Sequence, residues 1–212
     1  MIDSLPELTL LETRILGTLL EKQRTVPDTY PLSVNALQSG CNQKTSRNPV
    51  LETGEAEILV ALDALRERGL VREVSGSRVS RFEHLLEKVL GVPSQASALL
   101  AVLMLRGPQT AGELRLNCER LHRFADISSV EAFLEELAAR NDGALVVELP
   151  RLPGARENRW MHLLSGQSTM ESSAAGGRAV AASNTDIDEL RSRVAILEAE
   201  VAELRRLILD RN

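Results

Sequence analysis

The chain has 212 residues, with 25 lysines and arginines against 30 aspartates and glutamates and a formal net charge of −5. This length suits one large domain or two small ones. Because no block of the sequence is basic overall, nucleic-acid binding would have to depend on a local patch. The start of the chain has no signal-peptide pattern, and the longest apolar run, 98–105, is far shorter than the ~20 residues that cross a bilayer, so we expect a cytoplasmic protein without membrane contact.

Residues 1–90 predict three helices followed by a β-hairpin. Apolar residues at helical spacing predict helices over 8–22, 31–41 and 54–68, and Thr53 is the expected N-cap of the third. The segment LVREVSGSRVSRFEH predicts two strands around a Ser-Gly turn. This order of elements is that of a winged-helix domain. The inward face of the third helix is expected to consist of Ile58, Leu59, Leu62 and Leu65.

Residues 91–164 predict the same order a second time. Helices are expected over 95–106, 110–122 and 128–140, the last opened by a capping box that starts at Ser128. The segment ALVVELPRLPGARENRWMHLL then predicts a second hairpin with a longer loop.

One motif supports a duplication directly. GSRVSRFEHLL at 76–86 returns as GARENRWMHLL at 154–164, with Phe82 matched by Trp160. Internal repetition at a long offset indicates a duplicated unit. The sequence therefore predicts a mainly α fold with small β-hairpins, of the α+β class, built from tandem winged-helix domains over 1–90 and 91–164.

The C-terminal segment differs in composition from the rest. Residues 165–184 are small and polar, which is typical of a flexible linker, and 185–212 predict a helix with a heptad repeat. β-branched residues at a and leucines at d favour a parallel two-stranded coiled coil and hence a homodimer. A helix of this length could instead pack against its own chain. The predicted dimerisation residues are Ile187, Leu190, Val194, Leu197, Val201, Leu204 and Ile208.

No pattern in the sequence predicts catalysis. The segment GCNQKTSRNPV lacks the glycine that precedes the lysine in phosphate-binding loops. Cys118 and His122 have the i, i+4 spacing of shared metal ligands, but two ligands do not make a zinc site and Cys118 fits an apolar stripe, so we expect a core thiol. His84 and His162 are expected to be structural because the duplication explains their match. We therefore expect no enzyme activity, no cofactor and no metal.

The charged residues leave two kinds of binding open. The expected third helices carry carboxylates, among them Asp63 and Glu135, which would repel phosphates in a DNA groove. Arginines near the hairpins, and the basic residues of the 40–50 segment, could instead contact the DNA backbone or minor groove. The candidate nucleic-acid-binding residues are Lys44, Arg47, Arg72, Arg78, Arg81, Arg151, Arg156 and Arg159.

Each of these surfaces has a structural explanation as well. The amides and hydroxyls of 40–50 could simply satisfy the end of the second helix, and the hairpins could be solvated surfaces with scattered ion pairs. The first functional hypothesis is a dimeric regulatory protein that contacts duplex DNA. The alternative is a protein-interaction adaptor without direct nucleic-acid binding, whose acidic third helices face a partner, similar to the acidic tandem winged-helix subunits of chromosome-organising complexes.

Three stretches carry a resemblance to a known family. YPLSVNALQSGCNQKTSRNPV at 30–50, GELR at 112–115 and RWMHLLSG at 159–166 resemble the pattern of the YceH family of uncharacterised bacterial proteins. The likeness covers about 8–166 and ends in a similar heptad helix. It implies a tandem winged-helix fold and brings no established activity.

Overall fold

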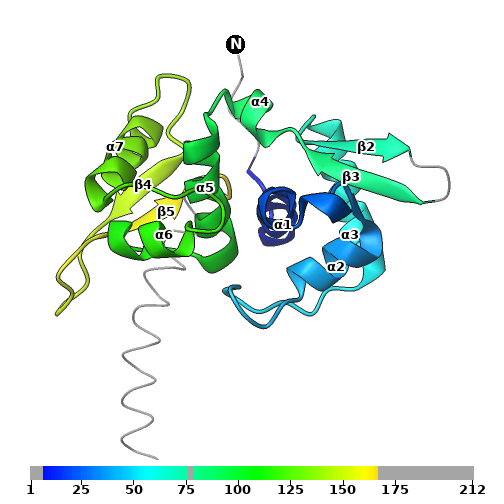
Figure 1. The fold of residues 1–212 in the computed structure, drawn as a ribbon, viewed down its shortest axis with the longest axis horizontal. Coiled ribbons are helices and arrows are strands. Elements are labelled where there is room, and N and C mark those ends of the chain that lie inside the picture. The colour runs from blue at the N-terminus through cyan, green and yellow to red at the C-terminus, as the bar shows by residue number, and fades with distance from the viewer. Residues whose placement is uncertain (1–6, 76–78, 167–212) are drawn as a thin grey trace, which may run out of the picture. The chain divides into compact units, whose positions relative to one another are not determined.

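The structure is a computed structural model that describes residues 7–75 and 79–166. These belong to one compact unit, Met1–Gln167, and the rest of the chain, Ser168–Asn212, forms a second. The predicted heptad helix over 185–212, most of the predicted linker and Arg78 therefore lie outside the described residues. The described part mixes helices with small antiparallel sheets (Figure 1), and none of its helices combines the length and apolar character needed to cross a membrane.

The first half of the unit, residues 7–90, contains three main helices and then a hairpin. The hairpin strands pair antiparallel, and a short strand ahead of the second helix adds to them, giving the sheet order β1-β3-β2. The elements are α1 (Leu10–Thr25), η1 (Pro27–Thr29), β1 (Leu32–Ser33), α2 (Val34–Cys41), α3 (Glu55–Glu67), β2 (Val71–Ser75), β3 (Ser80–His84) and α4 (Leu86–Leu90).

The second half, residues 91–166, repeats this order. Its two strands form an antiparallel hairpin, and an isolated bridge between Gln109 and Trp160 takes the place of β1. The elements are α5 (Ser94–Arg106), α6 (Ala111–Asn117), α7 (Ile127–Ala138), β4 (Val146–Leu149) and β5 (Arg159–His162).

The two hairpins share one register, as the repeated motif predicts. His84 lies opposite Val71 in the first hairpin, and His162 lies opposite Val146 in the second. The backbone bond that closes each hairpin at its base also recurs, from the amide of Leu85 to the carbonyl of residue 70 and from the amide of residue 163 to the carbonyl of residue 145. The repeat in the sequence is therefore a repeat in the backbone.

Two predicted N-cap residues are wrong by one or two positions. Thr53 does not cap α3, because the chain reaches the N-cap at Gly54, whose amide donates to the Glu57 carboxylate at 2.8 Å. The Ser128 capping box is likewise displaced, because Asp126 caps α7 and accepts from the amide of Ser129 at 2.8 Å. The cap of α3 thus lies one residue after the predicted one, and the cap of α7 lies two residues before it.

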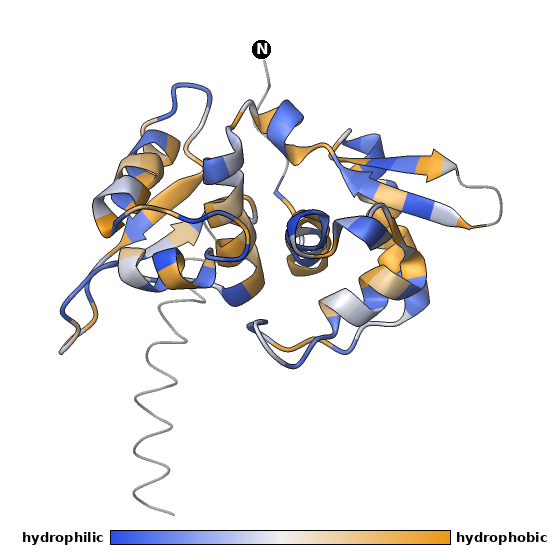
Figure 2. Ribbon diagram, in the orientation of Figure 1, coloured by the Kyte–Doolittle hydropathy of each residue, from blue (hydrophilic) through white to orange (hydrophobic). Residues whose placement is uncertain are grey.

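The halves join through α1 and α5, which pack side by side. Apolar side chains follow one another along most of α5 (Figure 2). Gly17 of α1 allows a close approach, since a Cβ there would lie 2.9 Å from Cγ of Leu105. A polar contact closes one end of this packing, where Arg24 donates to Glu87 at 2.7 Å and to Ser97 at 2.6 Å.

The repeated histidines lie in the hairpins, His84 buried and His162 half-buried, and neither is part of a polar site. Nε2 of His84 lies 2.8 Å from Oε1 of Gln23, whereas Nδ1 of His84 and of His162 is buried without a hydrogen-bond partner. Burial lowers the pKa of each ring to about 4; around His84, Glu87 and Glu83 oppose this shift, whereas Arg24 adds to it. Both side chains are therefore neutral in the folded protein at neutral pH.

Acid should weaken the fold through these two rings. An unfolded histidine has a pKa near 6.5, so the stability that comes from keeping the rings neutral is complete above about pH 6.5 and is lost as the pH falls toward 4. Between pH 7.5 and 5.5 we expect a loss of about 1–1.5 kcal/mol for each ring, measured by urea unfolding. The double variant His84→Gln, His162→Gln should lose much less over the same interval; equal losses in both proteins would contradict the assignment.

Candidate functional site

Arg47 is not available to a ligand, contrary to its place among the candidate binding residues. Its side chain is almost fully buried, and the residue is 6% exposed. The guanidinium donates to Glu21 at 2.7 Å and to the carbonyl of Gly40 at 3.0 Å. Burial would raise the pKa of the Glu21 carboxyl, but the Arg47 guanidinium, with Lys22, holds it below its usual value. Arg47 is a structural residue, and only Lys44 remains exposed as a cation in this loop.

The other polar residues of the loop are also used inside the fold. Asn42 accepts from the amide and the hydroxyl of Thr53 at 3.0 and 2.9 Å and donates back to its carbonyl at 2.9 Å. Arg14 of α1, which is fully buried, donates to the carbonyls of Cys41 and Pro49. The sequence predicts that residues 40–50 either contact phosphates or satisfy hydrogen bonds at the end of the second helix. The contacts of Asn42 and Arg14 favour the structural explanation.

The arginines of the first hairpin have partners within the protein. Arg72 pairs with Glu83 on the neighbouring strand. Arg81 is exposed, but it donates to the carbonyls of Thr29 and Pro31 at 3.2 and 2.7 Å. Arg78 lies outside the described residues, and the two arginines of this hairpin that the structure describes, Arg72 and Arg81, both have partners.

The loop between β4 and β5 differs from the first hairpin. Arg151 and Arg156 are exposed and have no hydrogen bond or ion pair within the described part of the chain. Arg159 reaches Glu113 only at 4.0 Å. Leu152 stands between the arginines and is 44% exposed. The second hairpin therefore combines two arginines that have no partner in the described part of the chain with an exposed apolar side chain, although Glu148 and Glu157 are exposed on the same hairpin.

The outer side of α3 is apolar at its centre and acidic around it. Val60 is 72% exposed and Leu59 41% exposed, so the expectation that Leu59 faces inward is wrong. Ile58, Leu62 and Leu65 define the buried side, and their spacing places Leu59 beside it and Val60 opposite. We call this surface the α3 face. It consists of Ala56, Leu59 and Val60 with the exposed carboxylates Glu55, Asp63 and Glu67.

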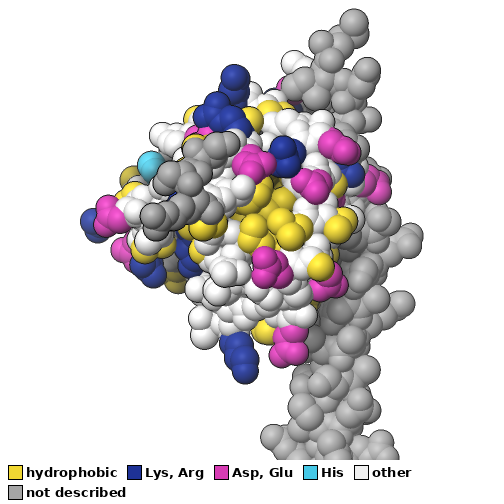
Figure 3. All heavy atoms as spheres, turned by 90° about the vertical axis from the view of Figure 1, so that its right-hand side faces the viewer, with side chains coloured by type: hydrophobic (Ala, Val, Ile, Leu, Met, Phe, Trp, Pro, Cys, Tyr) yellow, Lys and Arg dark blue, Asp and Glu magenta, His cyan; other side chains and the backbone are white. Residues whose placement is uncertain are grey.

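Figure 3 looks onto the side of the molecule that carries this helix and the first hairpin. Hydrophobic side chains gather near the centre of the view, and Asp and Glu side chains surround them. Carboxylates repel the phosphates of DNA. An apolar centre with a charged rim is the composition of a protein–protein contact surface.

The duplicated helix α7 has no such face. Leu65 and Arg68 match Leu137 and Arg140 in the repeat, so Leu59 and Val60 correspond to Glu131 and Ala132. Both of these are exposed on α7. The fold therefore does not require large apolar side chains at these positions, and those of α3 are a property of the first half alone.

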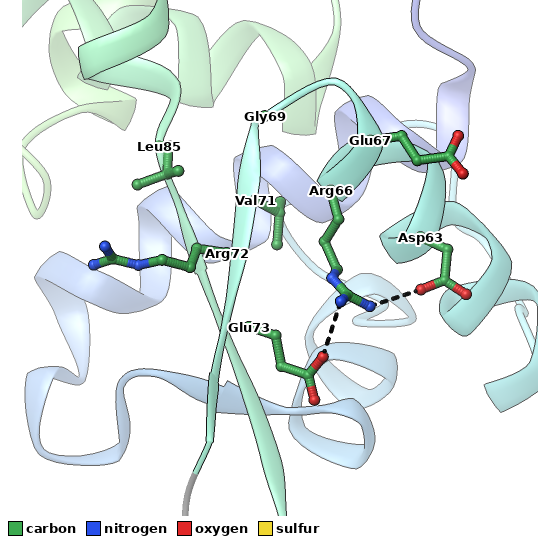
Figure 4. Close-up of a pocket in the computed structure, with 8 residues that line it drawn as sticks. All are labelled: Asp63, Arg66, Glu67, Gly69, Val71, Arg72, Glu73 and Leu85. Carbon is green, nitrogen blue, oxygen red and sulfur yellow. Dashed lines mark hydrogen bonds and ion pairs between the residues drawn. The ribbon is translucent and has the colours of Figure 1, made fainter.

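An open hollow of about 710 Å³ adjoins the α3 face, between the end of α3 and the edge strand β2 (Figure 4). Arg66 spans it, binding Asp63 at 3.0 Å and Glu73 at 3.3 Å. Arg66 thus neutralises part of the charge of Asp63 and Glu73, whereas Glu67 lines the hollow without a hydrogen bond or ion pair among the described residues. The lining residues are Asp63, Arg66, Glu67, Gly69, Val71, Arg72, Glu73 and Leu85.

The cysteines and histidines do not form a reactive centre. Cys41 and Cys118 are free, buried thiols at matching positions of α2 and the end of α6, and burial raises the pKa of both, that of Cys118 to about 12. No three His, Cys, Asp or Glu side chains within the described ranges are grouped as a metal would need. Cys118 is the core thiol that its apolar stripe predicts.

Comparison with known proteins identifies relatives along the whole chain. The family model described as "Protein of unknown function, DUF480" matches residues 8–155. A UPF0502 protein of Dechloromonas aromatica (strain RCB) is 79% identical over 212 residues, covering 100% of this chain and 99% of that protein. UPF0502 proteins of Burkholderia multivorans and Burkholderia pseudomallei (strain 668) are 61% and 59% identical over 207 and 206 residues, each covering 97% of this chain and 88% of the relative.

The two cations of the 40–50 loop should respond differently to substitution. Arg47→Met leaves the Glu21 carboxylate and the Gly40 carbonyl without their donor, so we expect the free energy of unfolding to fall by about 2–4 kcal/mol. Lys44→Met, a matched change at the exposed cation, should stay within about 0.5 kcal/mol of the unaltered protein. Denaturant titration compares the three proteins, and a small effect of Arg47→Met would return this side chain to the candidate surface.

Proposed function

We propose that this chain, which belongs to the DUF480 family of UPF0502 proteins, is a non-catalytic tandem winged-helix protein that binds another protein through its α3 face. In each half, three helices precede a β-hairpin, which is the element order of a winged helix. The third helix is the element that such domains use for recognition, and here it is α3 or α7.

One observation carries the choice of a protein partner. Leu59 and Val60 are exposed among carboxylates on α3, whereas the same positions of α7 carry Glu131 and Ala132. Exposed apolar side chains within a polar rim mark protein interaction sites. The carboxylates would repel a phosphate backbone but attract lysine or arginine. The partner that fits is a protein segment with an apolar side chain flanked by cations.

A photo-crosslinker on the α3 face tests this proposal. With benzoylphenylalanine at Ala56, irradiation of bacterial cells that produce the chain should yield a protein adduct that Val60→Asp reduces at least about 10-fold, since a buried charge without a partner costs more than 1.4 kcal/mol.

The duplication supplies the matched control for this experiment. The same probe at Ser128, which corresponds to Ala56 on α7, should give no adduct that depends on Val60. Equal adducts from both positions, or an adduct that Val60→Asp leaves unchanged, would remove the support for an α3 partner.

Duplex DNA is a second candidate because of the second hairpin. Arg151 and Arg156 are exposed without partners in the described part of the chain, which leaves their charges free to contact phosphates. This contact would be local and independent of sequence, since no recognition helix with suitable donors accompanies it.

Salt dependence is the measurement that decides on DNA. If the loop binds phosphates, log affinity for an arbitrary duplex should fall with log salt with a slope of about −0.9 for each phosphate neutralised. Arg151→Ala with Arg156→Ala should reduce the slope by about 2. Arg72→Ala with Arg81→Ala serves as the control, because these exposed arginines already have hydrogen-bond or ion-pair partners within the protein. Absence of binding at about 50 mM salt would exclude this candidate.

The heptad pattern supports a parallel homodimer as part of the same proposal, although the segment lies outside the described residues. Removal of residues 184–212 should convert a dimer into a monomer by light scattering, because the a and d side chains are lost. An unchanged mass would refute the predicted coiled coil. The substitution of Leu197 alone by Asp should act in the same direction without shortening the chain.

A further inference from the structure

The second-hairpin loop, residues 150–158, presents a leucine between arginines. It turns at Gly154, where φ is +81°, and the amide of Ala155 donates to the carbonyl of Leu152 at 3.0 Å. Leu152 is exposed, and so are Arg151 and Arg156, which flank it in the sequence. The loop therefore offers one large apolar side chain with two cations, next to one carboxylate, Glu157.

The loop matches the α3 face in chemistry. The α3 face has an apolar centre, Leu59 and Val60, and exposed carboxylates that include Glu55 and Glu67. Arginine pairs well with carboxylates because its planar guanidinium can donate two parallel bonds. A leucine between the arginines would gain nothing from a phosphate backbone, but it can be buried against valine and leucine.

The two surfaces differ from their counterparts in the other half. In the first hairpin the exposed apolar residue is Val79, and the arginine that follows it, Arg81, is bonded to the carbonyls of Thr29 and Pro31. On α7, Glu131 and Ala132 stand where α3 has Leu59 and Val60, and the exposed large apolar residue is Ile127 at the start of the helix. The differences between the halves are therefore complementary to each other. A contact between unlike surfaces of identical chains runs from head to tail unless it is repeated reciprocally across a twofold axis.

We propose that the α3 face binds the second-hairpin loop of a second copy of this chain. The proposal rests on the proposed function, since it names the partner of the same α3 face. The loop does not cover the α3 face of its own chain, because Leu152 and Val60 are both exposed in one structure. Leu152 packs on Leu59 and Val60, and the flanking arginines face the carboxylates of α3.

The contact is small and therefore weak by itself. A nine-residue loop on one helix buries much less than the ~1,200 Å² of a stable interface, so the association is transient between single chains. The predicted coiled-coil dimer would double the number of contacts and raise their effective concentration. Association should thus appear at high protein concentration and weaken as salt screens the ion pairs.

Sedimentation of the purified full-length chain over a wide concentration range tests the proposal. The average mass should rise above the value reached on dilution. Val60→Asp and Leu152→Asp should each abolish the rise, whereas Ala132→Asp, the matched change on α7, should retain it. Circular dichroism of each variant checks that these exposed positions leave the fold intact.

Mixing the two inactive variants gives the most specific outcome. The Val60→Asp chain keeps an intact loop and the Leu152→Asp chain keeps an intact α3 face, so an equimolar mixture should regain association that neither shows alone. Exchange of coiled-coil partners does not imitate this result, because it leaves the mass of a dimer unchanged. Failure of the mixture to regain mass would overturn the head-to-tail contact.

Other outcomes separate this proposal from the one it rests on. If the unaltered chain shows no rise in mass while the Val60-dependent crosslink in cells persists, self-docking is wrong and the α3 face binds a different protein. If both are absent, both proposals are wrong. If Leu152→Asp changes only the affinity for duplex DNA and not the mass, the loop is a nucleic-acid contact and the self-docking proposal is overturned.

Discussion

A buried guanidinium, that of Arg14 in α1, is the constraint on which the arrangement of the two halves depends. It donates to the carbonyl of Cys41 at 3.1 Å, at the end of α2, and to that of Pro49 at 2.6 Å, within the segment that leads to α3. Burial and the nearby Arg47 lower its pKa, and these carbonyls accept from it in place of water. The loop that it holds then reaches α5, where the amide of Asn48 donates to the carbonyl of Leu105 at 2.8 Å.

This arrangement explains why a loop rich in polar residues does not act as a binding site. Arg47, Asn42 and Ser46 are all bonded inside the protein, and Ser46 accepts from Arg106 of the second half at 2.7 Å. The loop is thus part of the junction between the halves. Binding has to take place on surfaces that the junction does not use, and the α3 face and the second-hairpin loop are two of them.

Sequence periodicity was sufficient for the helices and hairpins but not for the details that need a distant partner. The repeated motif predicted both hairpins because a register is a local property, whereas β1 has only two residues and exists because β3 lies beside it. Arg47 looked like a surface cation because its partner, Glu21, is 26 residues away. Leu59 could have been placed on the outside from the spacing of Ile58, Leu62 and Leu65. Val60 and Leu152 carry no motif, so only their exposure identifies them.

The duplication separates what the fold requires from what it permits. Positions that pack the core recur in both halves: Leu37 and Cys41 of α2 correspond to Leu114 and Cys118, and all four are fully buried. Positions that face solvent have diverged, with large apolar residues on α3 and a leucine between arginines in the second hairpin. Equivalent positions of the two halves meet the same packing demands, so a difference between equivalent exposed positions is not explained by the stability of the shared backbone arrangement. The two exposed surfaces that differ between the halves are complementary in charge and in apolar character, and this makes contact between chains a more economical explanation than two unrelated sites.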